Sequence, residues 1–405
     1  MASATPAVAA PAGLRGRLGS LDAFRGFTVA SMIFVSSLGG GSANAPYQLT
    51  HVQWHGATFR DLIAPFFLFA MGMAMAFALA RYVEGRTEES PWPGVVRRGA
   101  LLVLIGFALN FALYELPETD LSTFRIMGVL QRIGLAYLAA ATIVLLVRSV
   151  GAQVAIGLVI LVGYGIALAT VPVPGAGAGV LTPEGNLAGY VDRLVLTEAH
   201  LHRGGPFDPE GLLSTIPSVV TVMLGWWTGR WLRSHESRST APDAVSSGSS
   251  ARPGRAGVLG LLVAAGLLGV GGGLALGELQ PVNKAMWTPA FVLLTAGWGW
   301  LILAGFYGLV ELVGMRRLGW TFEVFGRNAL FAFTVPRVIA HLLDLWEVGP
   351  EGEGAFTYAY EGTIEVWAEP LFGVATASVL YGLLVTVVWW GIHYGMYRRG
   401  WFVRL

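Results

Sequence analysis

The chain has 405 residues, a formal net charge of +1 and no cysteine, and charged residues make up only 13% of it, against about a quarter in ordinary soluble domains. The near-neutral charge gives no reason to expect a nucleic-acid partner, and the lack of cysteine excludes disulfides, thiolate catalysis and cysteine-bound metals. Because 54% of the residues are hydrophobic and apolar runs of about 20 residues recur, the composition indicates an all-α polytopic membrane protein set in a lipid bilayer.

About ten membrane-spanning helices, an even number that leaves both termini on one side of the bilayer, are predicted from the lengths of the apolar runs. The run near the C-terminus that is interrupted most often contains Glu323, Arg327, Pro336 and Arg337. The expected ranges are 21–38, 59–80, 98–115, 126–147, 152–171, 212–232, 257–277, 287–311, 319–342 and 370–392.

The distribution of basic residues indicates which side the termini occupy. If the N-terminus is cytoplasmic, the cytoplasmic segments hold 17 of the 26 basic residues, and the sole lysine, Lys284, lies outside. Positive charge resists translocation, so both termini are predicted to be cytoplasmic. The chain then divides into a disordered tail (1–18), a six-helix half (19–233) with a large extracytoplasmic loop (172–211), a flexible cytoplasmic linker (234–256) and a four-helix half (257–405).

The stretch HVQWHGATFRD, residues 51–61, crowds proton-handling and charged groups at the entry to the second apolar run. An aspartate can orient a histidine ring and support its protonated form, so Asp61 is a candidate partner for His51 in general-base catalysis. The alternative is that these polar residues only anchor a helix at the membrane interface. Trp54 is equally a membrane-belt aromatic or a wall for a sugar ring. No metal is expected, because His51 and His55 have no evident third ligand.

Two further features place charge inside apolar segments. Arg132 lies nearly two turns into an expected span, where an arginine is costly unless it faces a watery cavity or pairs with a carboxylate such as Glu323. A second group, in and after the ninth expected span, suits either the relay of a transporter or the lining of an enzyme's tunnel: Arg327, Asn328, Arg337, His341 and Asp344.

Eight motifs follow one another from about residue 18 to the end of the chain: LDAFRG, HVQWHGATFRDLIAPFFLFAMG, RIMGVLQRIGLAYL, VPVPG, GYVDRLVL, FDPEGLLSTIPSVV, LQPVNKAMW and RRGWFVRL. In this order they resemble the heparan-α-glucosaminide N-acetyltransferase family of transmembrane acyltransferases. No single motif is specific, but the set is. The resemblance implies a bacterial-type member that lacks the lumenal N-terminal domain, sits in the plasma membrane and forms a homodimer.

The resemblance also implies a reaction, in which an acetyl group passes from cytoplasmic acetyl-CoA to the amine, or hydroxyl, of an extracytoplasmic amino sugar or glycan. His51 matches the family's active-site histidine, as general base or acetyl carrier, and Asp61 matches its aspartate. Residues expected to bind the acceptor are Ser36, Ser37, Trp54, His55, Arg125, Gln131, Asn283 and Lys284. Arginines expected to bind the nucleotide of acetyl-CoA are Arg97, Arg98, Arg132, Arg316 and Arg317.

One departure from the family pattern leaves other functions open. Ser36 or Ser37 stands where the family has an asparagine, and a hydroxyl lacks the paired geometry of an amide. A catalytically degenerate member that binds ligand without turnover is therefore a second reading. A transporter or flippase of an envelope precursor is a third, and binding of acetyl-CoA separates it from an acyltransferase.

Overall fold

A computed structural model describes residues 18–41, 43–117, 119–239, 254–349 and 352–403. Within these ranges there is no β-strand, only two isolated β-bridges. The helices, in chain order, are α1 (Gly19–Ser36), α2 (Phe59–Ala78), α3 (Ala80–Val83), α4 (Trp92–Asn110), α5 (Val129–Leu146), α6 (Val150–Thr170), α7 (Leu187–Leu196), α8 (Leu212–Ser239), α9 (Arg255–Gly277), α10 (Pro289–Tyr307), α11 (Arg316–Gly326), α12 (Ala329–Asp344), α13 (Ala355–Tyr360), α14 (Val366–Phe372) and α15 (Val374–Arg399).

Eight helices of the described ranges are long and apolar enough to cross a membrane, which confirms an all-α polytopic membrane protein. They are α2, α4 continued to Glu115, α5, α6, α8 to His235, α9, α10 continued to Leu312, and α15. Only 28% of the apolar window of α6, of α9 and of α15 is buried inside the protein. Their outward faces carry exposed apolar side chains such as Leu158, Leu268 and Val387, as expected where a helix meets lipid.

The remaining two expected spans, 21–38 and 319–342, are not among these eight helices. The prediction of one continuous helix over 319–342 is wrong. Helix α11 ends before Arg327, whose Nε donates to Glu323 at 2.9 Å, and α12 begins after Asn328. The Asn328 amide donates to the carbonyl of Trp401 at 2.8 Å and accepts from the N–H of Val403 at 2.9 Å. The backbone leaves the helical conformation at Asn328, and at the same residue the side chain binds the C-terminal segment.

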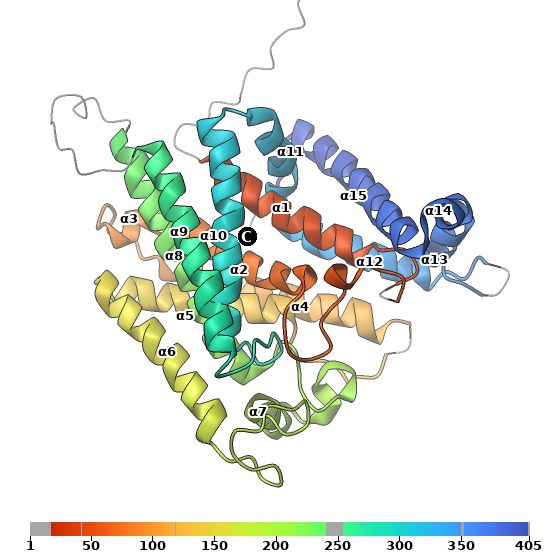
Figure 1. Ribbon diagram of the computed structural model, residues 1–405, viewed down its shortest axis with the longest axis horizontal. Coiled ribbons are helices and arrows are strands. Elements are labelled where there is room, and N and C mark those ends of the chain that lie inside the picture. Colours follow the sequence, from red (N-terminus) through yellow and green to blue (C-terminus); the bar gives the residue numbers. More distant parts are fainter. Residues whose placement is uncertain (1–17, 42, 118, 240–253, 350–351, 404–405) are drawn as a thin grey trace, which may run out of the picture.

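Helix α1, expected as a span at 21–38, has 18 residues and is mostly buried, and it is not among the eight helices above. Figure 1 shows it between α10 and α15, with α11 against it. The contact with α11 is close, because a Cβ at Gly26 would lie only 1.7 Å from the carbonyl oxygen of Phe322. Small residues allow helices to approach in this way, so α1 is a central element of the bundle.

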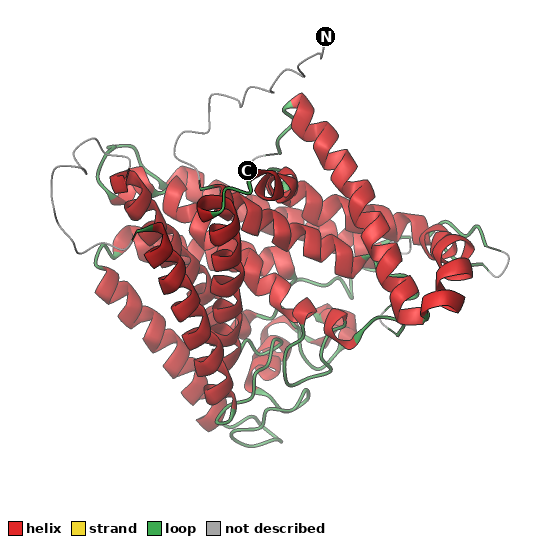
Figure 2. Ribbon diagram, turned by 45° about the horizontal axis from the view of Figure 1, so that its top comes forward, coloured by secondary structure: helices red, strands yellow, loops and turns green. Residues whose placement is uncertain are grey.

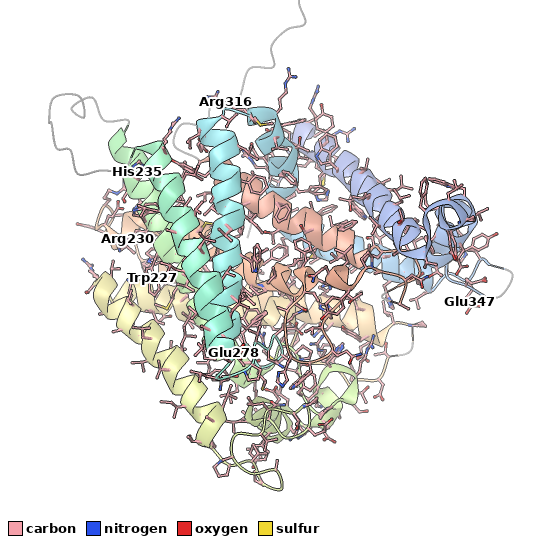
Figure 3. The ribbon with its side chains drawn as sticks, viewed as in Figure 1. Trp227, Arg230, His235, Glu278, Arg316 and Glu347 are labelled. Atoms are coloured by element: carbon pink, nitrogen blue, oxygen red, sulfur yellow. The ribbon has the colours of Figure 1, made fainter. Side chains whose placement is uncertain are left out.

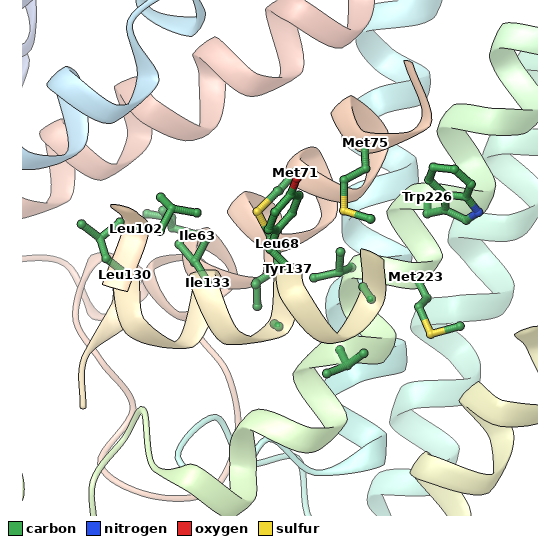
Figure 4. Packing of buried hydrophobic residues seen from close by; sticks show 14 of the residues in the cluster. Ile63, Leu68, Met71, Met75, Leu102, Leu130, Ile133, Tyr137, Met223 and Trp226 are labelled. Atoms are coloured by element: carbon green, nitrogen blue, oxygen red, sulfur yellow. The ribbon is translucent and has the colours of Figure 1, made fainter. Parts of the chain in front are cut away.

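Helices α2, α5 and α8 form the packed interior beside α1. Figure 4 shows Ile63, Leu68 and Met71 of α2 facing Ile133 and Tyr137 of α5, with Met223 and Trp226 of α8 nearby. A Cβ at Gly72 would lie 1.9 Å from the carbonyl oxygen of Val222, so α2 and α8 also meet through a small residue. This rigid packing fixes the position of the first turn of α2.

Three connecting segments, 37–58, 172–211 and 278–288, gather at one end of the bundle (Figures 1 and 2). The polar loop expected at 172–211 contains a helix, α7, whose N-cap Asn186 accepts from the N–H of Gly189 at 2.7 Å. Figure 3 shows Glu278 at this loop end of the bundle and Arg316 at the opposite end. The expected tail and linker lie largely outside the described residues, because these omit 1–17 and 240–253.

Candidate active site

His51 and Asp61 meet at the entry to α2. His51 Nδ1 lies 2.6 Å from Asp61 Oδ1, and 53% of the histidine side-chain surface stays accessible while that of Asp61 is 1%. The aspartate accepts hydrogen bonds only, so we assign the ring proton to Nδ1. This tautomer leaves the lone pair of Nε2 free to accept a proton, which is the state that a general base requires.

The carboxylate of Asp61 is held rigidly because it stands at the third position of α2. Its Oδ2 accepts from the backbone N–H of the N-cap, Thr58, at 3.2 Å, as in a capping box, and from the N–H of Val52 at 3.1 Å. The Thr58 hydroxyl lies 2.9 Å from the same oxygen. Asp61 Oδ2 therefore binds both the start of α2 and the loop before it, and Asp61 Oδ1 contacts His51.

Lys284 completes a three-membered charged cluster. Its Nζ lies 3.2 Å from Asp61 Oδ1 and 3.2 Å from His51 Nδ1. Partial burial of the ring and the nearby Lys284 ammonium lower the pKa of His51, and together they outweigh the hydrogen bond to Asp61, which raises it. The imidazole is consequently neutral at neutral pH.

The segment before α10 fixes the histidine loop from the other half of the chain. The Asn283 amide donates to the carbonyl of Trp54 at 2.9 Å, and the N–H of Gly56 donates to the carbonyl of Val282 at 2.8 Å. The Trp54 indole N–H in turn donates to the carbonyl of Leu181 at 2.7 Å. Two segments distant in the sequence thus hold the loop that carries His51.

A cavity of about 530 Å³ opens beside this cluster, within the size range of small-molecule sites. It is lined by α1, the first turn of α2, α4, α5, α12 and the loops at the same end of the bundle. Eight of the residues predicted for the site line it, namely Ser36, Ser37, His51, Trp54, Asp61, Arg125, Gln131 and Lys284.

Arg125 lines the cavity from a buried network of its own. Its Nε and one terminal nitrogen donate to the two oxygens of Asp208 at 2.9 and 2.6 Å, and that nitrogen also lies 2.6 Å from Glu210. These carboxylates, opposing a desolvation penalty, raise the pKa of Arg125 above its usual value, so it stays charged. Because two carboxylates already bind its guanidinium, Arg125 forms part of the cavity wall and is not available to bind a free anion.

Other residues predicted from the sequence lie away from this cavity. His55 lines an adjoining outer cavity of about 880 Å³. Asn283 does not line the inner cavity, and its side chain is bonded to the backbone of the histidine loop. Arg132 is buried, with its guanidinium 4.7 Å from the Trp287 ring centroid and hydrogen-bonded to the hydroxyl of Ser214. The four other arginines line neither cavity. Arg97 and Arg98 lie in the second turn of α4, and Arg316 and Arg317 begin α11.

Several lining residues were not predicted for the site. Asn110 at the end of α4 donates to the carbonyls of Arg125 and Met127 at 2.9 and 3.1 Å. The others include Arg60, Tyr114, His202, Phe207 and Glu210. Arg337, which belonged to the group expected to form either a transporter's relay or the lining of an enzyme's tunnel, also lines the cavity. Among the described residues, no group of three or more histidine and carboxylate side chains is placed to hold a metal ion.

Comparison with known proteins matches this architecture to one family. The model of the family described as heparan-alpha-glucosaminide N-acetyltransferase, catalytic, covers residues 17–256, which include His51, Asp61, Arg125 and Glu210. The Homo sapiens protein named heparan-alpha-glucosaminide N-acetyltransferase is 29% identical over 364 residues, covering 78% of this chain and 52% of its own length. The Mus musculus protein of that name is 27% identical over 382 residues, covering 83% and 56%.

The chain spans about half the length of the curated relatives it matches. The family model nevertheless covers more than half of the chain and the whole of the histidine loop. The chain belongs to the heparan-alpha-glucosaminide N-acetyltransferase catalytic family.

Proposed function

We propose that the chain is a transmembrane acetyltransferase that moves an acetyl group from acetyl-CoA to the amine of an amino sugar. The observation that carries the proposal is the contact of 2.6 Å between His51 Nδ1 and Asp61 Oδ1 at the wall of a cavity. A histidine whose Nδ1–H is held by a carboxylate presents Nε2 as a base. The names of the human and mouse relatives supply the reaction class.

The proposed chemistry needs only groups that the cavity wall supplies together with the two substrates. The acceptor amine attacks the thioester carbon, a C–N bond forms, and His51 Nε2 takes the proton that the nitrogen sheds. The C–S bond then breaks, and the histidine returns that proton to the departing thiolate of CoA. In the second form of this mechanism, Nε2 itself attacks the thioester carbon, the C–S bond breaks and CoA leaves as the thiolate. The amine then attacks the acetyl carbon and gives up a proton, and the bond between that carbon and Nε2 breaks.

Asp61 acts in this scheme through His51 and not on the substrates. It holds the ring tautomer, and its negative charge stabilises the imidazolium that forms as the proton arrives. Lys284 opposes that charge, which keeps the free imidazole unprotonated between turnovers. The hydroxyls of Ser36 and Ser37 are the proposed donors to the oxyanion, since both residues line the same cavity.

The nucleotide of acetyl-CoA is proposed to bind at the end of the bundle opposite the histidine loop, with both termini on that cytoplasmic side of a bacterial plasma membrane. Of the arginine pairs there, Arg97 and Arg98 are favoured, because the other end of their helix, at Asn110, lines the cavity. Arg98 precedes Asn110 by about 18 Å of helix axis. Arg316 and Arg317 begin α11, which contributes no lining residue to that cavity.

Turnover tests the proposal directly. The protein purified in detergent is incubated with radiolabelled acetyl-CoA and glucosamine, and both CoA release and acetylated glucosamine are measured. Formation of both products in equal amounts supports acetyl transfer. Binding of acetyl-CoA without any turnover favours a degenerate member, and a protein that does not bind acetyl-CoA favours transport. Mass measurement of the detergent complex tests the homodimer that we propose as its assembly.

A further inference from the structure

Two arginines of the cavity wall form no ion pair with a carboxylate of the described residues. Arg60, in the first turn of α2, makes one hydrogen bond, from a terminal nitrogen to the carbonyl of Leu49 at 3.3 Å. Arg337, on α12, has its guanidinium carbon 5.2 Å from the ring centroid of Phe333. Both line the cavity that contains His51, and neither forms an ion pair with any described residue.

The other charges of this cavity are neutralised within the protein. Arg125 is paired with Asp208 and Glu210, and Lys284 is paired with Asp61. The lining as a whole has four cationic side chains, which are Arg60, Arg125, Lys284 and Arg337, against the two carboxylates Asp61 and Glu210.

The guanidinium groups of Arg60 and Arg337 line the same cavity from two different helices, α2 and α12. Holding like charges together in a partly buried site is unfavourable unless an anion lies between them. A planar guanidinium forms paired hydrogen bonds with the oxygens of a carboxylate or phosphate, and two of them on different helices define a site for one such group.

The outer cavity, which adjoins the inner one, also favours a negatively charged ligand. It shares His51, Trp54, Arg60 and His202 with the inner one, and it adds the exposed Arg203. Of the residues that the structure describes, no aspartate or glutamate lines it. A vestibule with cationic and neutral walls concentrates anions and repels cations, so it favours an incoming molecule that carries negative charge.

We propose that Arg60 and Arg337 form a subsite for a carboxylate or phosphate of the acceptor, so that the natural acceptor is an anionic amino sugar. This inference rests on the proposed acetyltransferase function. The acceptor is a better source of the anion than the donor, because Arg60 adjoins Asp61 and also lines the outer cavity. The phosphates of acetyl-CoA are assigned above to the opposite end of the bundle.

The test compares acceptors that differ in charge. Initial rates are measured with glucosamine, glucosamine 6-phosphate and muramic acid for the unaltered protein, Arg60→Gln, Arg337→Gln and the control Arg148→Gln, an exposed arginine outside both cavities. We expect kcat/KM for an anionic acceptor to exceed that for glucosamine at least tenfold. The ratio of kcat/KM for the anionic acceptor to kcat/KM for glucosamine should fall at least tenfold in each cavity variant and stay unchanged in Arg148→Gln.

A ratio that is unaffected in both cavity variants overturns the proposal. A rise in the KM of acetyl-CoA in these variants, with the ratio intact, also overturns it and assigns the anion to the donor. If no amino sugar is acetylated, the proposed function has failed, and calorimetric binding of inorganic phosphate decides the subsite separately. Phosphate binding that is lost in Arg337→Gln and kept in Arg148→Gln upholds an anion site, whereas no binding to the unaltered protein rejects it.

Discussion

The Asn283 side chain donates a hydrogen bond of 2.9 Å to the backbone carbonyl of Trp54, which precedes it in the chain by 229 residues. Its carbonyl oxygen meanwhile accepts from the N–H of Met286 at 2.8 Å, so one fully buried amide joins the segment before α10 to the histidine loop. The next residue, Lys284, reaches Asp61. The second half of the chain therefore positions the residues that the first half supplies.

Replacing Asn283 with alanine is expected to lower both kcat and stability. The substitution frees the partly buried carbonyl of Trp54 and leaves the buried N–H of Met286 without a partner, at about 1–3 kcal/mol. A shift of the histidine by about 1 Å can reduce a rate on the order of 100-fold. Steady-state kinetics and thermal unfolding in detergent measure the two effects.

Asn328→Ala is the matched control for that variant. Asn328 is also fully buried and also holds a distant backbone segment, through Trp401 and Val403, but it lies outside the cavity. We expect a similar loss of stability and a much smaller loss of kcat. Equal kcat values in the two variants would contradict the positioning role of Asn283.

Asp61→Asn should reduce kcat by about 10²- to 10⁴-fold, the range that general acid–base catalysis contributes. An amide can no longer stabilise the imidazolium, and it leaves the Lys284 ammonium unpaired. Asp192→Asn, which alters a buried carboxylate on α7 that does not line the cavity, is the control. Rates measured at saturating acetyl-CoA and acceptor check the prediction, which fails if the two variants lose the same activity.

Lys284→Gln should move the acid limb of the pH–rate profile to higher pH. His51 must be neutral to accept a proton, and its pKa is held below the usual value of 6.5 by burial and by Lys284. The rate therefore falls as pH drops through that lowered pKa. Removing the cation makes protonation easier and raises the pKa, so the half-maximal rate is reached at a higher pH than in the unaltered protein.

The profile is measured as kcat with both substrates saturating, so that the ionisation of the free acceptor does not enter. Lys284→Arg keeps the positive charge and serves as the conservative variant, with a limb close to that of the unaltered protein. A limb that stays in place in Lys284→Gln, or moves to lower pH, would show that this ionisation belongs to another group.

The histidine and its aspartate could be predicted from the sequence because both lie in one short stretch that leads into an apolar helix. Of the residues from elsewhere in the chain, Arg125 and Lys284 were expected only through the family resemblance, and several others were not assigned to the site. Arg337 and Glu210 are brought to the cavity by tertiary packing, and the only local signal for Arg337 was a charge inside an apolar run. No periodicity in the sequence indicates that Arg125 would be engaged by Asp208.

The membrane spans show the same division between local and distant causes. Long apolar runs such as those of α6 and α9 are properties of the local sequence and were predicted. The break at Arg327 and Asn328 was not, and there the Asn328 side chain binds the distant C-terminal segment. Helix α7 was missed although Asn186 is a good N-cap, since its short run was read as part of a polar loop.

The double variant Arg97→Gln/Arg98→Gln should raise the KM of acetyl-CoA and leave kcat nearly unchanged. A hydrogen bond to a charged group contributes about 1.5–3 kcal/mol, and about 1.4 kcal/mol is a factor of ten in affinity. We therefore expect an increase of at least about tenfold. Arg316→Gln/Arg317→Gln removes the same charge from the start of α11 and should change this KM little. A larger rise in the KM of acetyl-CoA for Arg316→Gln/Arg317→Gln than for Arg97→Gln/Arg98→Gln would assign the phosphates to α11.

The most direct measurement of the central claim compares His51→Ala with His55→Ala in the acetyl-transfer assay. The two histidines lie four residues apart in one loop, and both side chains are largely exposed, but only His51 contacts Asp61. We predict that His51→Ala lowers kcat by at least about 10²-fold while His55→Ala changes it by less than about tenfold. If His51→Ala retains full turnover, or if His55→Ala is the inactive variant, His51 is not the base and the proposed mechanism is wrong.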